Sequence, residues 1–304
     1  MADLPVGECA LAGPRFIARN PMVIGAWTLM HFVVNFGLLL LFVGMAGAQL
    51  QAMQRTVAAT PQDSQAVLQA FAGIMPAYVV LMLASLIFYA VLYGSMNRAV
   101  LRPQDSAFAY LRLGLDELRQ GLLVLIYVVL FLVAYFAAAL FVGLIVGIMS
   151  LAHSPILSGL VILAGVLAVL ALFIFLGVRL SLSSALTFDT GRLNVFGGWA
   201  LSRGRFMPMF SVYLLCAVQV VLLAVIGGVI LWLVLSVLVP GGDVVQFFSK
   251  PDMGSVGAVL SPARLVYTAL SSVMFAVTLP VCLMSGPAIY RAVTTGRAVG
   301  EVFS

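Results

Sequence analysis

Six long runs of apolar residues dominate the pattern of hydrophobic and polar positions along the chain. They cover approximately residues 21–49, 73–97, 120–150, 156–178, 207–239 and 265–290, and none contains Asp, Glu, Lys or Arg. Because a bilayer core about 30 Å thick requires roughly 20 apolar residues of helix, each run is long enough to cross a membrane. Strands of a membrane barrel alternate apolar and polar residues, whereas the stretch Leu122–Leu132 is apolar throughout. The pattern therefore predicts an all-α polytopic membrane protein with six transmembrane helices.

The segments between these runs are too short for a second folded unit. We therefore expect residues 1–304 to form a single transmembrane domain. The first run is longer than the apolar core of roughly 7–15 residues in a signal peptide. Because the acidic residues Asp3 and Glu8 also precede it, we expect it to be retained as a membrane anchor.

Composition excludes two other classes of protein. Hydrophobic residues make up 63% of the chain and charged residues only 8%, whereas a soluble domain has roughly 25% charged residues. A soluble fold could not cover its surface with so few charges, and a disordered chain would need low hydrophobicity. The formal net charge of +5 would suggest a nucleic-acid partner in a soluble protein. Here the charge lies at the ends of membrane spans, so we expect no nucleic-acid partner.

Basic residues are distributed unevenly between the two sides of the predicted bundle. Twelve lie in the N-terminal tail, the 98–119 and 179–206 connections and the C-terminal tail, whereas only Arg55, Lys250 and Arg264 lie on the other side. Lys and Arg are enriched in cytoplasmic loops. The distribution predicts that both termini face the cytoplasm, in a multi-pass protein of the cell inner membrane.

The cytoplasmic connections carry amphipathic patterns. In the first, a helix capped by Asp105 or Ser106 would separate two faces, one with Phe108, Leu111, Leu115, Leu118 and Leu122 and one with Arg112, Asp116 and Arg119. The second sets Leu193, Phe196, Trp199 and Ala200 against Arg192, Ser202 and Arg203, and the C-terminal tail adds Val299, Val302 and Phe303 near Arg297. These patterns predict interfacial helices in the headgroup layer. A docking surface for a cytoplasmic partner protein is the alternative interpretation.

The six spans also pair into three helical hairpins. Each hairpin leaves the membrane at an arginine, namely Arg98, Arg179 or Arg291. Internal duplication is common in transport proteins, so a threefold repeat is one interpretation. The other is that selection for cytoplasmic positive charge places these arginines without any duplication.

Polar residues and helix breakers are rare within the spans. Thr28, His31 and Asn35 share a helix face in the first span, which allows either hydrogen bonds between helices or a proton relay through the histidine. No span offers the carboxylate that a relay needs, and so the structural role is favoured, as it is for Gln219. In the sixth span Pro280 predicts a kink, and Ser285-Gly286-Pro287 predicts a second break.

Motifs for catalysis are not found in the sequence. The serines at positions 95 and 285 have no histidine at their predicted depth, and two isolated histidines cannot supply the ligands of a zinc protease. There is no P-loop or dinucleotide fingerprint, and the three cysteines show no paired spacing. We therefore expect no enzymatic activity, no catalytic residue, no metal and no cofactor. An intramembrane hydrolase is the weakest of the alternatives.

One stretch, residues 179–213, resembles a known family. It contains Arg179-Leu180-Ser181 at a span exit and then Phe196-Gly197-Gly198-Trp199-Ala200-Leu201-Ser202-Arg203-Gly204-Arg205-Phe206. This stretch is similar to bacterial YciC-like membrane proteins and to the membrane domain that precedes some glycerophosphodiester phosphodiesterases. The resemblance implies a six-helix membrane domain with a lipid-linked role. The phosphodiesterase catalytic domain is absent from the sequence, so none of its catalytic residues can be assigned here.

The sequence therefore favours a non-enzymatic inner-membrane protein that associates with lipid or organises the membrane. Its candidate contacts with anionic headgroups or a partner protein are Arg112, Arg119, Arg192, Arg203, Arg205 and Trp199. The alternative function is a transporter or permease subunit that works with a partner ATPase on a neutral or lipid-like substrate. Gly143 and Gly147 form a GxxxG pair suited to close helix packing, within the chain or in a homo-oligomer.

Overall fold

A computed structural model describes residues 4–59, 64–150, 155–249 and 254–295, and these residues form helices and turns without a strand. Six helices are long and apolar enough to cross a membrane, which confirms the predicted all-α polytopic architecture. They are α3 (Pro21–Ala59), α4 (Ser64–Leu101), α5 (Leu115–Ser150), α6 (Pro155–Leu180), α9 (Phe206–Leu238) and α12 (Pro262–Leu283). Helices α3 and α4 extend beyond the predicted apolar runs 21–49 and 73–97, the first to Ala59 and the second from Ser64.

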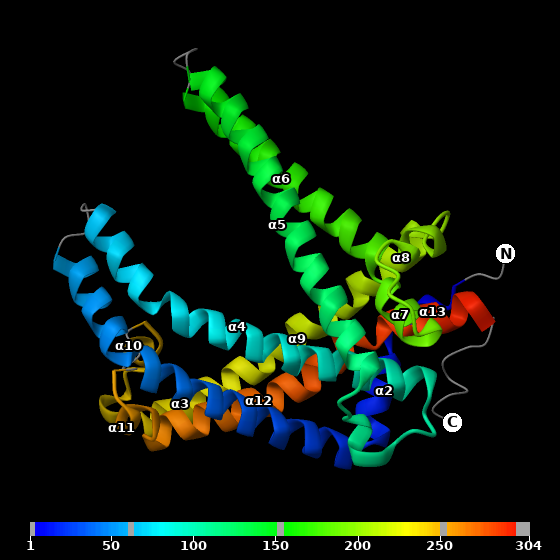
Figure 1. Cartoon of the computed structure of the whole chain (residues 1–304), viewed down its shortest axis with the longest axis horizontal. Helices are drawn as coiled ribbons and strands as arrows, with labels where there is room; N and C mark the ends of the chain where they lie inside the picture. Colours follow the sequence, from blue (N-terminus) through cyan, green and yellow to red (C-terminus); the bar gives the residue numbers. More distant parts are fainter. Residues whose placement is uncertain (1–3, 60–63, 151–154, 250–253, 296–304) are drawn as a thin grey trace.

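The long helices form three hairpins, α3–α4, α5–α6 and α9–α12, which converge at one end of the molecule (Figure 1). At this end lie the short helices α1 (Val6–Ala10), α2 (Ala12–Arg19), α7 (Ser183–Thr190), α8 (Gly197–Leu201) and α13 (Ser285–Thr295). At the opposite end lie η2 (Pro240–Gly242), α10 (Val244–Ser249) and α11 (Val256–Val259). The α5–α6 hairpin diverges from the other two as it leaves the shared end. We call that shared end the arginine end, because the span-exit arginines lie there.

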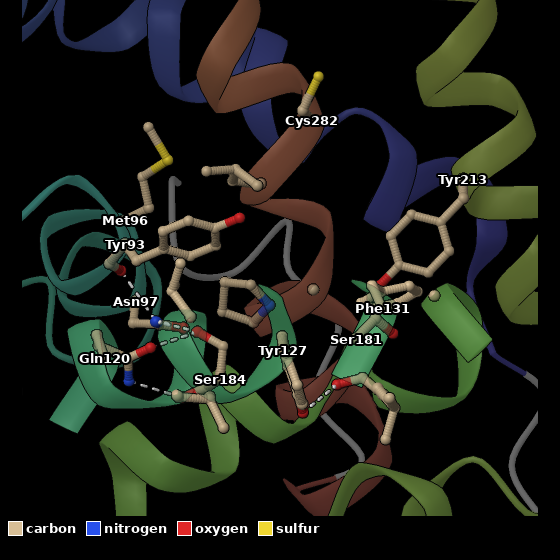
Figure 2. A pocket seen from close by; sticks show the side chains of 17 residues that line it. Tyr93, Met96, Asn97, Gln120, Tyr127, Phe131, Ser181, Ser184, Tyr213 and Cys282 are labelled. Carbon is tan, nitrogen blue, oxygen red and sulfur yellow. Dashed lines mark hydrogen bonds between the residues drawn. The ribbon is translucent and has the colours of Figure 1, made fainter. Parts of the chain in front are cut away.

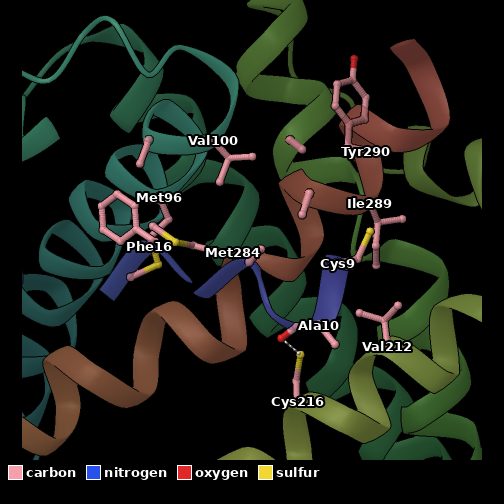
Figure 3. Close-up of a cluster of buried hydrophobic side chains, with 14 of the residues drawn as sticks. Cys9, Ala10, Phe16, Met96, Val100, Val212, Cys216, Met284, Ile289 and Tyr290 are labelled. Atoms are coloured by element: carbon pink, nitrogen blue, oxygen red, sulfur yellow. Dashed lines mark hydrogen bonds between the residues drawn. The ribbon is translucent and has the colours of Figure 1, made fainter. Parts of the chain in front are cut away.

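The N-terminal helices α1 and α2 are part of the bundle, although the sequence analysis treated them only as a flank. They contact α9, α12 and α13, and Cys9, Ala12 and Phe16 are fully buried. Figure 3 shows Cys9, Ala10 and Phe16 among apolar side chains from α4, α9 and α13. The Gln219 amide donates a hydrogen bond to the Ala10 carbonyl at 3.3 Å. Burial raises the pKa of the Cys9 thiol to about 12, and the nearby Glu8 carboxylate adds a smaller upward shift, so this thiol stays protonated at neutral pH.

Helix α2 crosses α12 at the proline that the sequence marks as a kink. A Cβ atom on Gly13 would lie 2.5 Å from the Pro280 carbonyl oxygen, so only glycine permits this close approach. The Met284 amide, one turn after Pro280, donates a hydrogen bond to the Pro280 carbonyl. Helix α12 ends at Leu283, and α13 begins at Ser285. The span is therefore broken at the predicted Ser285-Gly286-Pro287 position.

The first interfacial segment differs from the helix predicted from Asp105 onward. Residues Ala107–Tyr110 form the 3₁₀ turn η1, with Phe108, Ala109 and Tyr110 all in the left-handed region, and α5 begins only at Leu115. Such conformations cost about 1–3 kcal/mol each unless neighbouring groups hold them. Here the Trp27 indole donates to the Ala109 carbonyl at 2.9 Å and the Arg98 guanidinium to the Tyr110 carbonyl at 2.6 Å. These tertiary hydrogen bonds override the local helical pattern.

The second interfacial segment contains more structure than its sequence pattern indicates. Its helical part is the single turn α8, whereas the preceding residues form a buried helix, α7, in which Ala185, Thr187 and Phe188 are inaccessible to solvent. The glycine at position 191 ends α7 in the left-handed conformation. The predicted C-terminal amphipathic segment, with Val299, Val302, Phe303 and Arg297, lies outside the described residues.

Substitution of Gly13 by alanine tests the packing of α2 on α12. We expect the Gly13→Ala variant to lose about 1–3 kcal/mol of unfolding free energy, because the added methyl group meets backbone atoms that cannot move aside. Reversible unfolding in mixed detergent micelles measures the change. Gly7→Ala is the matched control, since a Cβ atom on Gly7 has no neighbour within 4 Å. Equal stability of the two variants would contradict the close approach.

Candidate functional site

At the arginine end, Arg98 joins the first hairpin to the second. Its guanidinium forms an ion pair with Glu117 at 2.5 Å, and each side chain is only 4% exposed. Glu117 reaches this position over Gly94, where an added Cβ atom would lie 2.7 Å from the carboxylate oxygen. The pair connects the last turns of α4 to the first turn of α5, so it sets where the α5–α6 hairpin begins.

A second exit arginine, Arg179, joins the second hairpin to the third. It donates a hydrogen bond to the Ser202 carbonyl at 2.9 Å. Its guanidinium carbon also lies 5.3–5.7 Å from the ring centroids of Phe175, Trp199 and Phe206. These distances allow cation–π attraction. The candidate lipid contact Trp199 therefore packs against Arg179, and 37% of its surface remains exposed.

The third exit arginine, Arg291, joins the last hairpin back to the first. It donates a hydrogen bond to the Val100 carbonyl at 3.0 Å, and the neighbouring Tyr290 hydroxyl donates to Asp189 on α7 at 2.8 Å. Arg179 precedes the break between α6 and α7, whereas Arg291 follows the break between α12 and α13. All three exit arginines therefore bind groups inside the bundle, but they differ in where they lie relative to the helix breaks.

A cavity of about 210 Å³ lies where the three hairpins meet (Figure 2). Its lining residues come from α4, α5, α9, the α6–α7 junction and the α12–α13 junction, and none of them is charged. Tyr93, Tyr127 and Tyr213 contribute rings and hydroxyl groups to it, as Figure 2 shows. We call this space the junction cavity.

A chain of side-chain hydrogen bonds forms one wall of the junction cavity. The Asn97 amide nitrogen donates to the Ser184 hydroxyl at 2.9 Å, and that hydroxyl donates to the Gln120 amide oxygen at 2.7 Å. The Gln120 nitrogen donates in turn to the Ser184 carbonyl at 3.1 Å. The chain thereby links α4, α5 and α7 through uncharged groups.

Two buried polar atoms of the cavity lining have no hydrogen-bond partner in the described structure. They are Oδ1 of Asn97, a residue that is 2% exposed, and the hydroxyl group of Tyr213. By contrast, the Tyr127 hydroxyl donates to the Val195 carbonyl at 2.8 Å, and the Ser181 hydroxyl donates to the Val178 carbonyl at 2.8 Å. Unsatisfied buried polar atoms are uncommon and mark a place where another molecule can supply the missing bond.

The junction cavity continues into an apolar groove between α6 and α9. Gly177, Ser181 and Tyr213 line both spaces, and the groove has a volume of about 420 Å³. Its remaining lining residues are Ile174, Val178, Phe210, Leu214 and Ala217. A Cβ atom on Gly177 would have no neighbour within 4 Å, so the passage is open at this residue. We call this space the α6–α9 groove.

The candidate headgroup contacts all lie at the arginine end, but not all of them are free to bind lipid. Arg112, Arg192 and Arg203 are exposed. Arg119 forms an ion pair with Asp116 at 2.9 Å. Arg205 is partly buried, and its guanidinium lies 3.5 Å from the Leu201 carbonyl.

The intramembrane residues Thr28, His31 and Asn35 do not act as one group. His31 Nδ1 lies 2.9 Å from the Ser272 hydroxyl on α12, and its ring stacks on Phe275 with centroids 3.9 Å apart. Because the Ser272 hydroxyl already donates to the Thr268 carbonyl, the imidazole is the donor in this pair. Thr28 is half-buried and Asn35 is exposed. The histidine therefore joins α3 to α12, as expected of a structural hydrogen bond between helices.

The polar residues that form the hydrogen-bonded wall of the junction cavity are not among those that the sequence singles out. Asn97, Gln120 and Ser184 lie far apart in the chain, and Asn97 and Gln120 stand at the ends of predicted apolar runs. Their signal is positional, because Asn97 directly precedes Arg98 and Gln120 directly follows Arg119. Both arginines stand at the end of a span on the same side of the bundle, so the polar residues next to them lie at the same depth.

The described part of the chain holds no group of three or more His, Cys, Asp or Glu residues that could bind a metal ion.

Comparisons with protein-family models, curated proteins and solved structures find no match to the chain. The resemblance of residues 179–213 to YciC-like proteins therefore stays a prediction.

Substitution of Ser184 tests the hydrogen-bond chain of the cavity wall. We expect Ser184→Ala to lower the unfolding free energy by about 1–3 kcal/mol, because the buried Gln120 amide oxygen would lose its donor and the Asn97 amide nitrogen would keep only its bond to the Tyr93 carbonyl. Detergent unfolding measured by circular dichroism gives the value. Ser211→Ala is the control, since its hydroxyl is exposed and bonds only to Met207 of its own helix. A loss for Ser184→Ala no larger than that for Ser211→Ala would contradict the network.

Proposed function

We propose that this chain is a non-enzymatic, lipid-associated protein of a cell inner membrane, with its arginine end at the cytoplasmic face. The observation that carries the proposal is the combination of exposed arginines and exposed apolar side chains on the same connections. Arg112 lies beside Leu113, which is 80% exposed, and follows Phe108, which is 85% exposed. This combination suits the boundary between lipid headgroups and acyl chains.

The energetics of this boundary favour anionic lipid. Apolar side chains such as Phe108 and Leu113 gain by entering the acyl region, while the guanidinium groups stay at the level of the phosphates. Each basic residue near an anionic surface contributes about 1 kcal/mol. Among the candidate headgroup contacts, Arg112, Arg192 and Arg203 are the exposed arginines, whereas the exit arginines bind groups within the bundle. The proposed relation to YciC-like proteins agrees with such a lipid-linked role.

Neutralising the exposed arginines tests the proposal. We expect the triple variant Arg112→Gln/Arg192→Gln/Arg203→Gln to retain at least tenfold less phosphatidylglycerol through purification, since about 1 kcal/mol per arginine is lost. Native mass spectrometry of the lipid-bound protein counts the retained lipids. Phosphatidylcholine, which has no net charge, is the reference lipid.

The matched control is Arg55→Gln. Arg55 is also exposed but lies at the opposite end of α3, away from the arginine end. We expect it to leave phosphatidylglycerol retention unchanged. Equal retention by the triple variant, the control and the parent chain would refute anionic headgroup contact at the arginine end.

A second candidate function is a transporter subunit that works with a partner ATPase on a neutral or lipid-like substrate. The uncharged junction cavity at the meeting point of the hairpins is the observation that favours it. Under this function the cytoplasmic connections would form the docking surface for the ATPase. Co-purification of an ATPase that is lost in the Arg112→Gln/Arg192→Gln/Arg203→Gln variant would favour the transporter over a purely lipid-associated role.

A further inference from the structure

We propose that the junction cavity and the α6–α9 groove together form a binding site for an uncharged, hydroxyl-bearing lipid of the diacylglycerol type. The hydroxyl head lies in the cavity and an acyl chain lies in the groove. This site is separate from the exposed arginines, and the inference holds whether or not those arginines bind anionic headgroups.

The polar groups of the cavity define what the head must supply. Oδ1 of Asn97 is an acceptor without a donor, and the Tyr213 hydroxyl can donate or accept one bond. Asn97 and Tyr213 lie on opposite sides of the cavity (Figure 2). A free lipid hydroxyl can donate to the Asn97 oxygen, and an ester carbonyl of the same lipid can accept from the Tyr213 hydroxyl. The head of a diacylglycerol thus carries both kinds of group that the two atoms need.

The absence of charge from the cavity lining excludes a phosphate head. Burying an ionised group without a paired charge is strongly unfavourable. The three arginines that are next in sequence to lining residues do not line the cavity themselves. Arg98 pairs with Glu117, Arg119 pairs with Asp116, and Arg179 binds Ser202 and three aromatic rings. A cavity of about 210 Å³ bounded by amides, hydroxyls and rings accepts a neutral polar group instead.

The position of the cavity along the bundle matches the depth of a lipid head. Asn97, Gln120 and Leu180 all line the cavity, and each is next in sequence to an arginine of the arginine end. The cavity therefore lies just inside the headgroup layer, at the level of lipid ester and hydroxyl groups. Water alone does not explain the site, because the cavity opens past Gly177 into a groove with apolar walls that suits an acyl chain.

Photo-crosslinking tests the inference directly. The purified full-length protein in nanodiscs is exposed to diacylglycerol with a diazirine and an alkyne in one acyl chain, or to phosphatidylglycerol with the same chain. We expect diacylglycerol to label peptides from 174–181 and 210–217 more strongly than phosphatidylglycerol does. Unlabelled diacylglycerol in excess should compete for this labelling.

Two variants separate binding from folding. Tyr213→Phe removes a hydroxyl that lies near Ser181 but makes no hydrogen bond within the described residues, so we expect unchanged thermal stability but about three- to tenfold weaker diacylglycerol labelling. Gly177→Leu fills the passage between cavity and groove, and we expect it to abolish that labelling. Gly143→Leu, at an exposed glycine of α5 with equal open space, is the control that keeps full labelling.

Several outcomes would overturn the inference. Preferential labelling of the two peptides by phosphatidylglycerol would show that the site takes a charged head. Labelling that is unchanged in both Tyr213→Phe and Gly177→Leu would show that the lipid binds elsewhere on the surface. A loss of thermal stability in Tyr213→Phe would show that the hydroxyl stabilises the fold and does not serve to bind lipid. None of these results depends on the exposed arginines, so failure here is distinguishable from failure of anionic headgroup contact.

Discussion

The buried ion pair between Arg98 and Glu117 is the constraint on which the arrangement of the hairpins depends. Isolated charges are too costly to bury near a membrane, so each partner requires the other. The same guanidinium also holds the carbonyl of Tyr110 in its left-handed turn, and Gly94 provides the space for the carboxylate. The start of α5, and with it the direction of the diverging α5–α6 hairpin, is therefore set from the end of α4.

This constraint also explains the position of the junction cavity. Asn97 and Gln120 are neighbours in sequence of Arg98 and Arg119, so fixing α4 against α5 brings their amides to opposite ends of the Ser184 bridge. Arg179 and Arg291 fix the remaining hairpins at the same level. The basic residues of the arginine end thus fall into two groups: three exit arginines bind groups within the bundle, and exposed arginines are available for the proposed contact with lipid.

The six spans could be predicted from the sequence because the bilayer imposes length and apolarity on every crossing helix. The break before Ser285 was also predictable from the glycine and proline that follow it. The turn at Phe108–Tyr110 was not, because it is held by the Trp27 indole, 82 residues away in the chain. The packing of Gly13 on Pro280 could not be predicted for the same reason, nor could the contacts among Asn97, Gln120 and Ser184. These contacts form only when segments that are distant in the chain pack together.

The most direct test of this account is a double-mutant cycle of Arg98→Gln and Glu117→Gln, measured as unfolding free energy in detergent. Each single variant leaves one buried charge without its partner, so we expect each to lose about 3–5 kcal/mol. The double variant should lose clearly less than the sum of the two, which reveals a strong coupling. Losses below about 1 kcal/mol that simply add, as for an exposed pair, would contradict the central role of this interaction.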